Sequence, residues 1–202
     1  MNKIVIASNN TKKIEQMRHA LSVLGSNYEI VGLKDIGYAK EIIEDGKTFE
    51  ENSLKKAMQI YNDTGYIAIA DDSGLCVDAM NGAPGVYTAR YAGENATRKE
   101  KLEKMLDELK DVKDPNRTAK FVCVISCVIS KNSIIQTRGE LNGKISTKIV
   151  NIEDGLTQDP IFIPEGSDKT MSQFTTDEKL AISHRGKAIR KFVSEFVNKI
   201  NY

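Results

Sequence analysis

The sequence predicts a mixed α/β fold, and three features of its pattern indicate this class. Early in the chain, apolar runs typical of short buried strands alternate with amphipathic helical segments. Strand-like runs then cluster between about residues 119 and 150. No linker-like stretch interrupts the 202 residues, so any two lobes are expected to share one continuous sheet or interface. This order is typical of a sheet flanked by helices.

The first part of the chain predicts a strand, a helix, a second helix and a second strand. Their expected bounds, in order, are residues 3–7, about 11–24, about 48–62 and 67–70. Apolar side chains at helical spacing mark the two helices, and Gly25 and Gly65 mark their ends. The second strand lies in the stretch YIAIADDSGL and ends in two adjacent carboxylates, Asp71 and Asp72.

The second part of the chain predicts a loop, further strands and two helices. A capping box at Thr97 and Glu100 starts a helix that carries Leu102 and Leu109. Ser183 is a candidate cap for a terminal helix whose apolar residues keep helical spacing. The other expected elements are a loop at residues 81–87 and strands at residues 119–130, 134–140 and 143–150.

Composition and charge argue against several classes of protein. The 29 basic and 28 acidic residues give a net charge of +1, whereas a duplex nucleic-acid binder usually carries a strong basic excess. No apolar run approaches the roughly 20 residues that span a bilayer, and the first residues are too polar for a secretory signal. Cys76, Cys123 and Cys127 lie in apolar runs without metal spacing. We therefore expect them to pack in the core of a cytoplasmic protein.

The stretch SNNTKK, residues 8–13, joins the first predicted strand to a helix. Lys12 and Lys13 fall in the first helical turn, where the helix dipole opposes each cation by roughly 0.3 to 1 kcal/mol. Free backbone N–H groups at the same helix start suit an anion. A bound phosphate would therefore turn the two lysines into a clamp, while the alternative is that both point into solvent.

Carboxylates after the second predicted strand indicate a cation site. In open α/β sheets, ligands bind beyond the carboxyl ends of the strands, where Asp71 and Asp72 are expected. Glu44, from an acidic cluster before the second helix, is a candidate further ligand. Such a set suits Mg²⁺, which usually takes one or two carboxylates plus substrate phosphates. The alternative is a turn or capping role, which we favour for Asp45.

A third group of polar residues lies near the start of the terminal helix. His184 and Arg185 follow the predicted helix cap, with Lys179 upstream and Asp159 in the preceding loop. These side chains offer several donors to an acceptor-rich ligand. A structural histidine is the alternative for His184, and it is the interpretation that we favour for His19.

Together, the three groups describe an enzyme that acts on a nucleotide. The residues alone leave kinase, cyclase, nuclease and pyrophosphatase open, and the absence of a GxxxxGK[ST] sequence disfavours a Walker-type NTPase. One rival hypothesis is a nucleotide-binding module that has lost catalysis. Such a module would lose its acidic residues, whereas Asp72 and Glu44 are both present. The other rival is a nucleic-acid-binding protein, against which the net charge speaks.

Several segments, in this order, resemble the inosine triphosphate pyrophosphatase family, also called noncanonical purine NTP pyrophosphatases. IASNNTKKIEQM resembles the opening T-G-N-x-x-K-x-x-E signature, and EDGKTFEENSLKKA resembles the E-x-G-x-T-F-x-E-N-A-x-x-K-A segment. ADDSGLCVDAMNGAPGVYTARYAG is close to the longest motif of the family, and DPIFIPEG and EKLAISHRGKAI resemble its closing blocks. The resemblance runs nearly end to end.

The resemblance implies a single domain over residues 1–202. Its fold would be a long twisted mixed sheet flanked by helices, in two lobes with a central cleft for the substrate. It further implies hydrolysis of ITP, dITP or XTP to the monophosphate and pyrophosphate, with Mg²⁺ as cofactor and a role in sanitising the nucleotide pool. Members of the family are usually homodimers, and no nucleic-acid or membrane partner is expected.

By the same resemblance, Asp72 is the general base and a metal ligand, and Glu44 is the second metal ligand. These roles supply the charge neutralisation and oriented water that phosphoryl-type hydrolysis needs. Side-chain donors that recognise the base would form hydrogen bonds with the 6-oxo group of inosine or xanthosine. They would have no acceptor in the 6-amino group of adenine. The implied substrate-binding residues are Ser8, Asn9, Asn10, Thr11, Lys12 and Lys13 for the triphosphate, Ser73, and Leu156, Thr157, Gln158, Asp159, Lys179, His184 and Arg185 toward the base.

The base-reading half departs from the family pattern. GLTQDP, residues 155–160, stands where the family has G-F-G-Y-D-P or G-W-G-W-D-P, so Leu156 replaces an aromatic ring. A base–aromatic stack is worth roughly 1–3 kcal/mol. TMSQF, residues 170–174, likewise replaces a T-A-A-E-L-like run. We expect the pyrophosphohydrolase chemistry to be retained, and the alternative is altered base selectivity or a catalytically weak nucleotide-binding protein.

Overall fold

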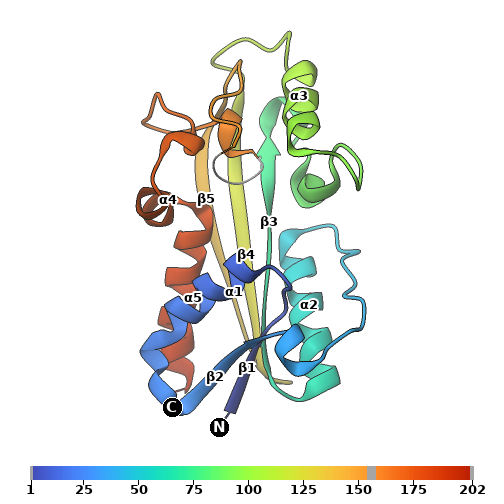
Figure 1. Ribbon diagram of the computed structural model, residues 1–202, viewed down its shortest axis with the longest axis vertical. Helices are drawn as coiled ribbons and strands as arrows, with labels where there is room; N and C mark the ends of the chain where they lie inside the picture. The colour runs from blue at the N-terminus through green and yellow to red at the C-terminus, as the bar shows by residue number, and fades with distance from the viewer. Residues whose placement is uncertain (1, 154–157, 201–202) are drawn as a thin grey trace. The chain divides into compact units, whose positions relative to one another are not determined.

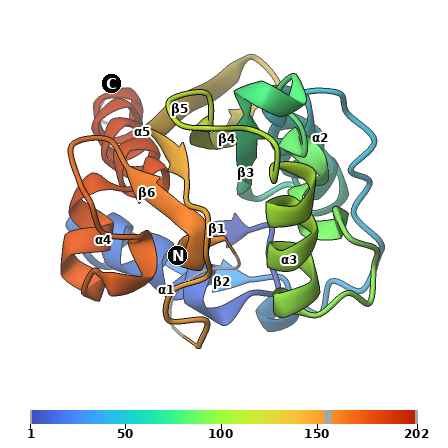
Figure 2. The same ribbon diagram turned by 90° about the horizontal axis from the view of Figure 1, so that it is seen from above.

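The computed structural model describes residues 2–153 and 158–200. Within this part, one mixed sheet has the strand order β2-β1-β3-β4-β5-β6 and is flanked by helices (Figures 1 and 2). The strands are β1 (Asn2–Ile6), β2 (Tyr28–Gly32), β3 (Ile67–Val77), β4 (Thr118–Ser130), β5 (Ser133–Ile145) and β6 (Phe162–Pro164). The helices are α1 (Thr11–Ala20), α2 (Phe49–Thr64), α3 (Arg98–Glu108), α4 (Thr176–Ile182) and α5 (His184–Ile200). The predicted mixed α/β fold is confirmed.

The chain divides into two compact units. Unit 1 comprises the residues up to 72, residues 123–139 and the residues from 187 on, and unit 2 comprises residues 73–122 and 140–186. The long strands β3, β4 and β5 each contribute residues to both units. That the whole chain forms a single domain stays a prediction.

The sheet of unit 1 is parallel at its N-terminal strand. β1 pairs in parallel with β2 and with β3, in a register that sets Ile6 opposite Gly32 and Ile69. Successive side chains of a strand point to opposite faces. Accordingly, Ile4 and Ile6 belong to the apolar cluster shared with α1 and α5, whereas Val5 belongs to the cluster shared with α2. Unit 1 is therefore a sheet covered by helices on both faces.

The helix signals of the sequence place α2 and α5 where they are expected. The Thr48 side chain accepts a hydrogen bond from the Glu51 backbone at the start of α2, and Gly65 ends the helix in the left-handed region at φ +71°. The Ser183 hydroxyl accepts from the Gly186 N–H (3.1 Å) at the start of α5. The apolar stripe of α5 is buried through Phe192 and Phe196, which confirms the predicted terminal helix.

Unit 2 has its own apolar core, into which α3 packs. The predicted capping box of Thr97 and Glu100 starts this helix. At its other end, the buried Arg117 side chain donates to the backbone carbonyls of Leu109, Val112, Ile145 and Ser146. Burial lowers the pKa of this guanidinium, and the four carbonyls compensate for the water that it has lost. Arg117 thereby ties the end of α3 to the end of β5.

Several expectations about secondary structure were wrong or incomplete. The helix predicted over 11–24 ends at Ala20 and continues as a 3₁₀ stretch, Leu21–Asn27. The strand predicted over 143–150 is instead the end of β5, which runs to Ile145 without a break. β2 and β6 were not predicted, because β2 is short and half exposed and β6 has three residues. β6 is too short for a periodic pattern to stand out, and β2 mixes polar and apolar residues in the sequence YEIVG.

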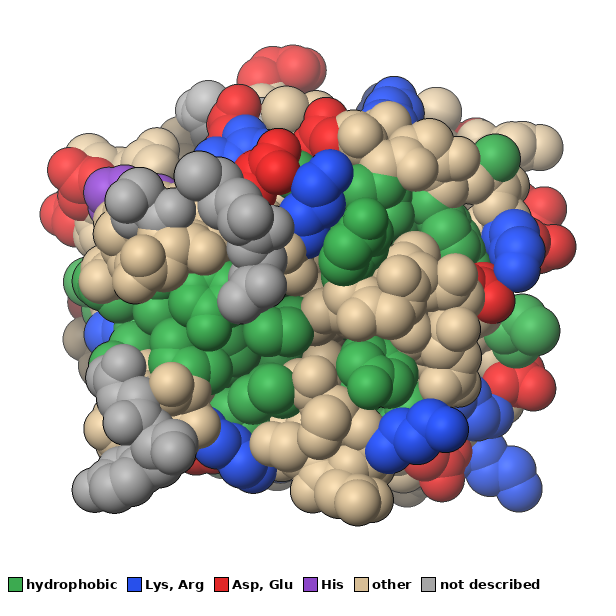
Figure 3. Space-filling model, turned by 90° about the horizontal axis from the view of Figure 1, so that it is seen from below, with side chains coloured by type: hydrophobic (Ala, Val, Ile, Leu, Met, Phe, Trp, Pro, Cys, Tyr) green, Lys and Arg blue, Asp and Glu red, His purple; other side chains and the backbone are tan. Residues whose placement is uncertain are grey.

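Charges of both signs share one face of the molecule (Figure 3), and two of the three cysteines are buried. On the described part of the face in Figure 3, basic and acidic side chains are interspersed around an apolar area, and no continuous basic patch forms there. Among residues 2–153 and 158–200, no helix is long and apolar enough to cross a membrane. Cys123 and Cys127 are buried and Cys76 is half-buried, and burial raises the pKa of the Cys127 thiol. The predicted core role of the cysteines is thus confirmed for Cys123 and Cys127.

Candidate active site

The junction of β1 and α1 carries the stretch predicted to hold a triphosphate. Asn10 caps α1, and its side chain accepts from the Lys13 N–H (3.3 Å), while its own N–H donates to Ser8 Oγ (3.1 Å). Because helix α1 begins at Thr11, Lys13 falls in the first turn, as predicted. Lys13 Nζ lies 2.9 Å from Asp71 Oδ2, so this cation is held by a carboxylate rather than pointing free into solvent.

The remaining residues of that stretch differ in how fully they are described. Asn9 and Thr11 are exposed, and Ser8 is half-buried. The side chain of Lys12 lies outside what the structure describes. The N-terminal turn therefore presents Ser8, Asn9 and Lys13 beside Asp71, and the phosphate-binding roles of these residues stay predictions.

Asp71 and Asp72 lie inside β3, which corrects the expectation that they end a strand. The pairing of β1 with β3 reaches Ile6 and Ile69, and β3 then continues to Val77. The two carboxylates thus follow directly on the last residue pair of β1 and β3. They still occupy the carboxyl end of the parallel part of the sheet, which is where α/β proteins bind ligands.

A buried lysine on α2 joins the predicted metal ligands. Lys56 Nζ lies 3.2 Å from Glu44 Oε2 and 3.7 Å from Asp72 Oδ1, and the Lys56 side chain is 8% exposed. One turn earlier on the same helix, Asn52 Nδ2 donates to Asp72 Oδ2 (3.1 Å). A charge this deeply buried is costly unless it is paired, so Lys56 brings Glu44 and Asp72 to one point.

Sequence reasoning missed Asn52 and Lys56, although a signal was present. The two residues are four apart in EENSLKKA, which places them on one face of a helix. The Asn52 side chain also packs closely against Gly46, whose N–H donates to Asn52 Oδ1 (2.8 Å). A Cβ added at Gly46 would lie 2.7 Å from that oxygen and 2.8 Å from Glu51 Cβ, which is too close for any side chain.

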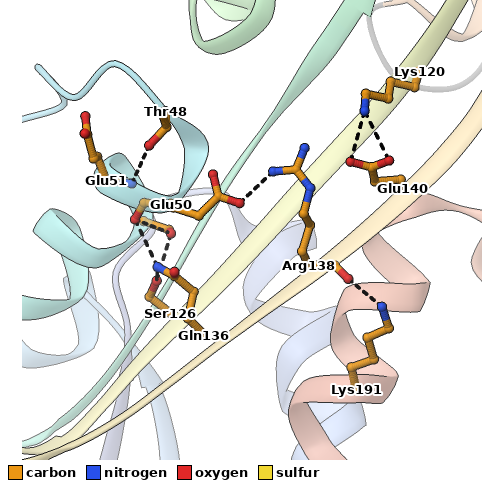
Figure 4. A network of polar contacts seen from close by, with 10 residues as sticks. Thr48, Glu50, Glu51, Lys120, Ser126, Gln136, Arg138, Glu140 and Lys191 are labelled. Atoms are coloured by element: carbon orange, nitrogen blue, oxygen red, sulfur yellow. Dashed lines mark hydrogen bonds and ion pairs between the residues drawn. The ribbon is translucent and has the colours of Figure 1, made fainter.

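The first turn of α2 is fixed to β4 and β5 by a polar network (Figure 4). Arg138 Nη1 donates to Glu50 Oε1 (2.6 Å), and Gln136 Nε2 donates to both the Glu50 carbonyl (3.1 Å) and Ser126 Oγ (2.9 Å). The Ser53 and Ser126 hydroxyls are bonded at 2.8 Å and are fully buried. This network holds the helix turn that carries Asn52.

A cavity of about 360 Å³ lies within unit 1 beside these groups. Three lysines and three carboxylates line it, together with apolar and hydroxyl-bearing residues. The charged lining residues are Lys13, Lys40, Lys56, Glu41, Glu44 and Asp71, and Ser8 and Asn9 join them. Sequence reasoning assigned no role to Lys40. A cavity with both charge signs is suited to a polyanion accompanied by a cation.

The carboxylates of Glu44 and Asp72 suit Mg²⁺ better than a metal ion that takes all of its ligands from the protein. Among the described residues, no group of three or more His, Cys, Asp or Glu side chains is placed to hold a metal ion. Glu44 and Asp72 do converge on one cationic atom, Lys56 Nζ. Mg²⁺ typically uses one or two carboxylates together with substrate phosphates and waters. Asp45, by contrast, pairs with Lys55 (2.6 Å), and this hydrogen bond lowers its pKa.

The residues predicted to read the base lie in unit 2. Lys179 Nζ, on α4, lies 3.3 Å from the buried Asp159 Oδ2. Arg185 Nη2 donates to Ser73 Oγ (3.1 Å). The predicted residues thus form two polar pairs, each of which joins segments distant in the sequence.

His184 is buried and stacks on an aromatic ring. Its ring centroid lies 4.8 Å from that of Phe121, at an interplanar angle of 14°, and His184 is 5% exposed. The stacking supports the structural alternative that was weighed for this histidine. It also fixes the first residue of α5, next to Arg185.

The segment that departs from the family pattern is described only in part. Leu156 and Thr157 lie outside the described residues. Gln158 is 5% exposed, and its amide Nε2 has no hydrogen-bond partner within residues 2–153 and 158–200. The altered TMSQF run contributes Ser172, whose hydroxyl donates to the Val150 carbonyl (2.7 Å). The Val150 N–H in turn donates to the Pro160 carbonyl (2.9 Å). The segments that depart from the family pattern, GLTQDP and TMSQF, are therefore linked by hydrogen bonds through Val150.

Comparison with known proteins extends over both units. The chain matches the Ham1 family over residues 4–195. A dITP/XTP pyrophosphatase of Clostridium perfringens is 44% identical over 197 residues, covering 95% of each chain. A dITP/XTP pyrophosphatase of Bacillus subtilis is 40% identical over 191 residues, again covering 95% of each chain.

Solved structures show the same fold. The Staphylococcus aureus Ham1 protein matches with a TM-score of 0.89 at 37% identity, covering 98% of this chain and 100% of that one. A HAM1 protein of Coxiella burnetii matches with a TM-score of 0.90 at 35% identity, with the same coverage. The long mixed sheet flanked by helices, expected from the sequence motifs, is thus confirmed.

Proposed function

Because the chain belongs to the Ham1 family, we propose that it is a nucleoside-triphosphate pyrophosphohydrolase acting on noncanonical purine nucleotides. It cleaves ITP, dITP and XTP to the monophosphate and pyrophosphate, and so sanitises the nucleotide pool. Relatives about 40% identical carry the name dITP/XTP pyrophosphatase. The observation that carries the proposal is the convergence of Glu44, Asp72 and Lys56 beside a cavity lined by Lys13.

Asp72 is the proposed general base. Its Oδ2 accepts from Asn52 and its Oδ1 faces Lys56, and this arrangement orients the carboxylate that takes the proton of the attacking water. Lys13 and Lys56 neutralise the polyphosphate, with Ser8 to Lys13 forming the start of helix α1 around it. Positioning and charge neutralisation are the main requirements of this reaction.

Mg²⁺ is the proposed cofactor, and Glu44 and Asp72 would hold it. When bound, it supplies charge neutralisation on the phosphate oxygens. Lys56 contacts both carboxylates in the described structure, and it would compete with the ion for them or move onto a phosphate oxygen.

Recognition of the base is assigned to unit 2. Lys179 and Arg185 are donors, and a 6-oxo purine offers the acceptor that a 6-amino purine lacks. Asp159 holds the Lys179 ammonium in place (3.3 Å), while Ser73 is held by Arg185. The buried Gln158 and His184, and the segment with Leu156 and Thr157, complete the proposed base-binding set.

A catalytically weak nucleotide-binding protein is not favoured. Such a protein would be expected to lose the acidic groups and keep the lysines. Instead, Glu44 and Asp72 are both present, and each is held by a contact to Lys56. We further propose that the protein works in the cytoplasm as a homodimer and that its only substrates are small nucleotides rather than nucleic acid.

The proposal is tested by hydrolysis of ITP, dITP, XTP, GTP and ATP in the presence of Mg²⁺, with pyrophosphate and orthophosphate measured separately. Pyrophosphate release from the first three nucleotides is expected, at rates well above those for GTP and ATP. Release of orthophosphate alone would refute the mechanism. Equal rates on all five nucleotides would refute only the proposed selectivity.

A further inference from the structure

The loop between β2 and α2 forms one wall of the cavity in unit 1. We name residues 37–47 the acidic loop, since it carries Glu41, Glu44 and Asp45. Six of its residues line the cavity: Tyr38, Ala39, Lys40, Glu41, Ile42 and Glu44. No regular helix or strand is assigned in this segment, so side-chain contacts have to fix its course.

One glutamine on α2 makes three hydrogen bonds to this loop. Gln59 Nε2 donates to the Glu41 carbonyl (2.7 Å) and to Tyr38 Oη (2.9 Å), and Gln59 Oε1 accepts from the Ile43 N–H (3.2 Å). Both donors of the amide group and its acceptor are therefore used. The three contacts are to residues 38, 41 and 43, so the last of them lies one residue before Glu44.

A second set of contacts supports the same end of the loop. Asp63 accepts from Tyr38 Oη (2.7 Å) and from Lys40 Nζ (3.0 Å). Accordingly, the hydrogen bonds from Tyr38 and Lys40 lower the pKa of Asp63, and the bond to Asp63 raises the pKa of Lys40. Ile42 packs against the apolar cluster of α2. The acidic loop is thus fastened to α2 at several points, of which Gln59 spans the longest stretch.

The same helix also carries the lysine that meets Glu44. Gln59 and Lys56 are three residues apart on α2, a spacing that puts them on one face of the helix. Lys56 reaches Glu44 (3.2 Å), while Gln59 holds the backbone just before it. One rigid element therefore sets the position of both partners of this ion pair.

We propose that Gln59 is a positioning residue, which holds the acidic loop so that Glu44 and Lys40 face the substrate cavity. The inference rests on the proposed function, because it assigns Glu44 to binding of Mg²⁺ and polyphosphate. Gln59 itself touches neither ligand and acts through the loop backbone. Its loss is therefore expected to weaken binding while leaving the chemical step intact.

The test compares Gln59→Met with the wild-type protein. Methionine keeps the length of the side chain and the helix propensity but removes all three hydrogen bonds. Amide hydrogen exchange over residues 38–44 is expected to accelerate in the absence of any ligand. Calorimetry with Mg²⁺ and inorganic pyrophosphate is expected to show about tenfold weaker binding, from the loss of hydrogen bonds of ordinary strength. KM for ITP should rise by a similar factor, with kcat within about twofold of the wild type.

Two further variants serve as controls. Asn62→Ala changes an exposed amide side chain on the same helix and should leave exchange and binding unchanged. Tyr38→Phe removes one of the three partners of Gln59 together with the hydrogen bond to Asp63. It is expected to give a smaller effect in the same direction, so it provides a readout if Gln59→Met does not fold.

Failure of this inference can be told from failure of the proposed function. Unchanged exchange over residues 38–44, or accelerated exchange with unchanged affinity for Mg²⁺ and pyrophosphate, would overturn the positioning role. A wild-type protein that binds Mg²⁺ and pyrophosphate but releases no pyrophosphate from any triphosphate would instead overturn the proposed function.

Discussion

Unit 1 carries the residues proposed to bind the polyphosphate and unit 2 carries those proposed to read the base, and the two sets are built differently. In unit 1, charged side chains meet each other: Lys13 pairs with Asp71, and Lys56 pairs with Glu44 and Asp72. Among the residues of unit 2 predicted to read the base, Lys179 pairs with Asp159, Arg185 donates to the Ser73 hydroxyl, and His184 stacks on an aromatic ring. A triphosphate and a cation require the first kind of site, whereas a neutral base requires the second.

The difference shows where this chain can vary without losing its chemistry. A change in the charged half alters the balance of buried charges, which is costly. The loss of an uncharged contact in the base-reading half, such as a base–aromatic stack, costs roughly 1–3 kcal/mol. The departures GLTQDP and TMSQF fall in the second half. The comparison therefore predicts that unit 1 sets the rate and unit 2 sets the choice of base.

The largest effect is expected from Asp72→Asn in unit 1. Asparagine keeps the shape and can still accept the hydrogen bond from Asn52, but it cannot take a proton. Loss of the general base is expected to lower kcat about 10³-fold on every nucleotide. Steady-state assays of pyrophosphate release measure this, with Asp78→Asn, at an exposed carboxylate six residues further on, as the control. Activity within about tenfold of the wild type would exclude Asp72 as the base.

A smaller but equally uniform loss is expected from Lys13→Met. The ammonium is a charge-assisted donor at the predicted phosphate site, and such a bond is worth roughly 1.5–3 kcal/mol. The value of kcat/KM should fall about tenfold to a hundredfold for ITP, XTP, GTP and ATP alike. A loss of kcat/KM that differs among the nucleotides would contradict the prediction that unit 1 does not take part in the choice of base.

Lys179→Met in unit 2 should have the opposite pattern. Removing a donor to the 6-oxo group is expected to lower kcat/KM for ITP and XTP about tenfold while ATP hydrolysis stays the same. The ratio of the ITP rate to the ATP rate is therefore the quantity to measure. Since Asp159 would lose its cation, Lys179→Arg serves as a variant that keeps the charge. An equal loss of kcat/KM on all nucleotides would indicate that Lys179 contacts the phosphates rather than the base.

Much of the fold could be predicted from the sequence, because local signals agree with the tertiary structure. The caps at Thr97 and Ser183 predicted the starts of two helices. β6 could not be predicted, since three residues carry no period. The ends of β3 and β5 were also missed. A long strand that takes part in two units continues past polar residues such as Asp71, since its later residues pair and pack in a different core.

The candidate site was predicted unevenly for a similar reason. The sequence identified acidic residues and lysines in short motifs, but it did not show which of them pair with each other. Lys56, Asn52 and Gln59 were missed, although all three are on α2. Their roles depend on which residues approach from the acidic loop and from β3, and such contacts over distances in sequence leave no local pattern. A lysine buried to 8% exposure becomes notable only in three dimensions.

The smallest expected effect concerns the helix that presents Lys179. The Thr175 backbone N–H and hydroxyl donate to Glu178 and lower its pKa in the folded protein. A carboxyl with a lowered folded pKa contributes stability above its unfolded pKa, and this contribution is lost as the pH falls through the folded value. Glu178→Gln should therefore reduce stability slightly at neutral pH and flatten its decline between about pH 5 and about pH 3. Urea unfolding across this range measures the effect. If Glu178→Gln also changed the ratio of ITP to ATP hydrolysis at neutral pH, the end of α4 would be part of base selection and not only its support.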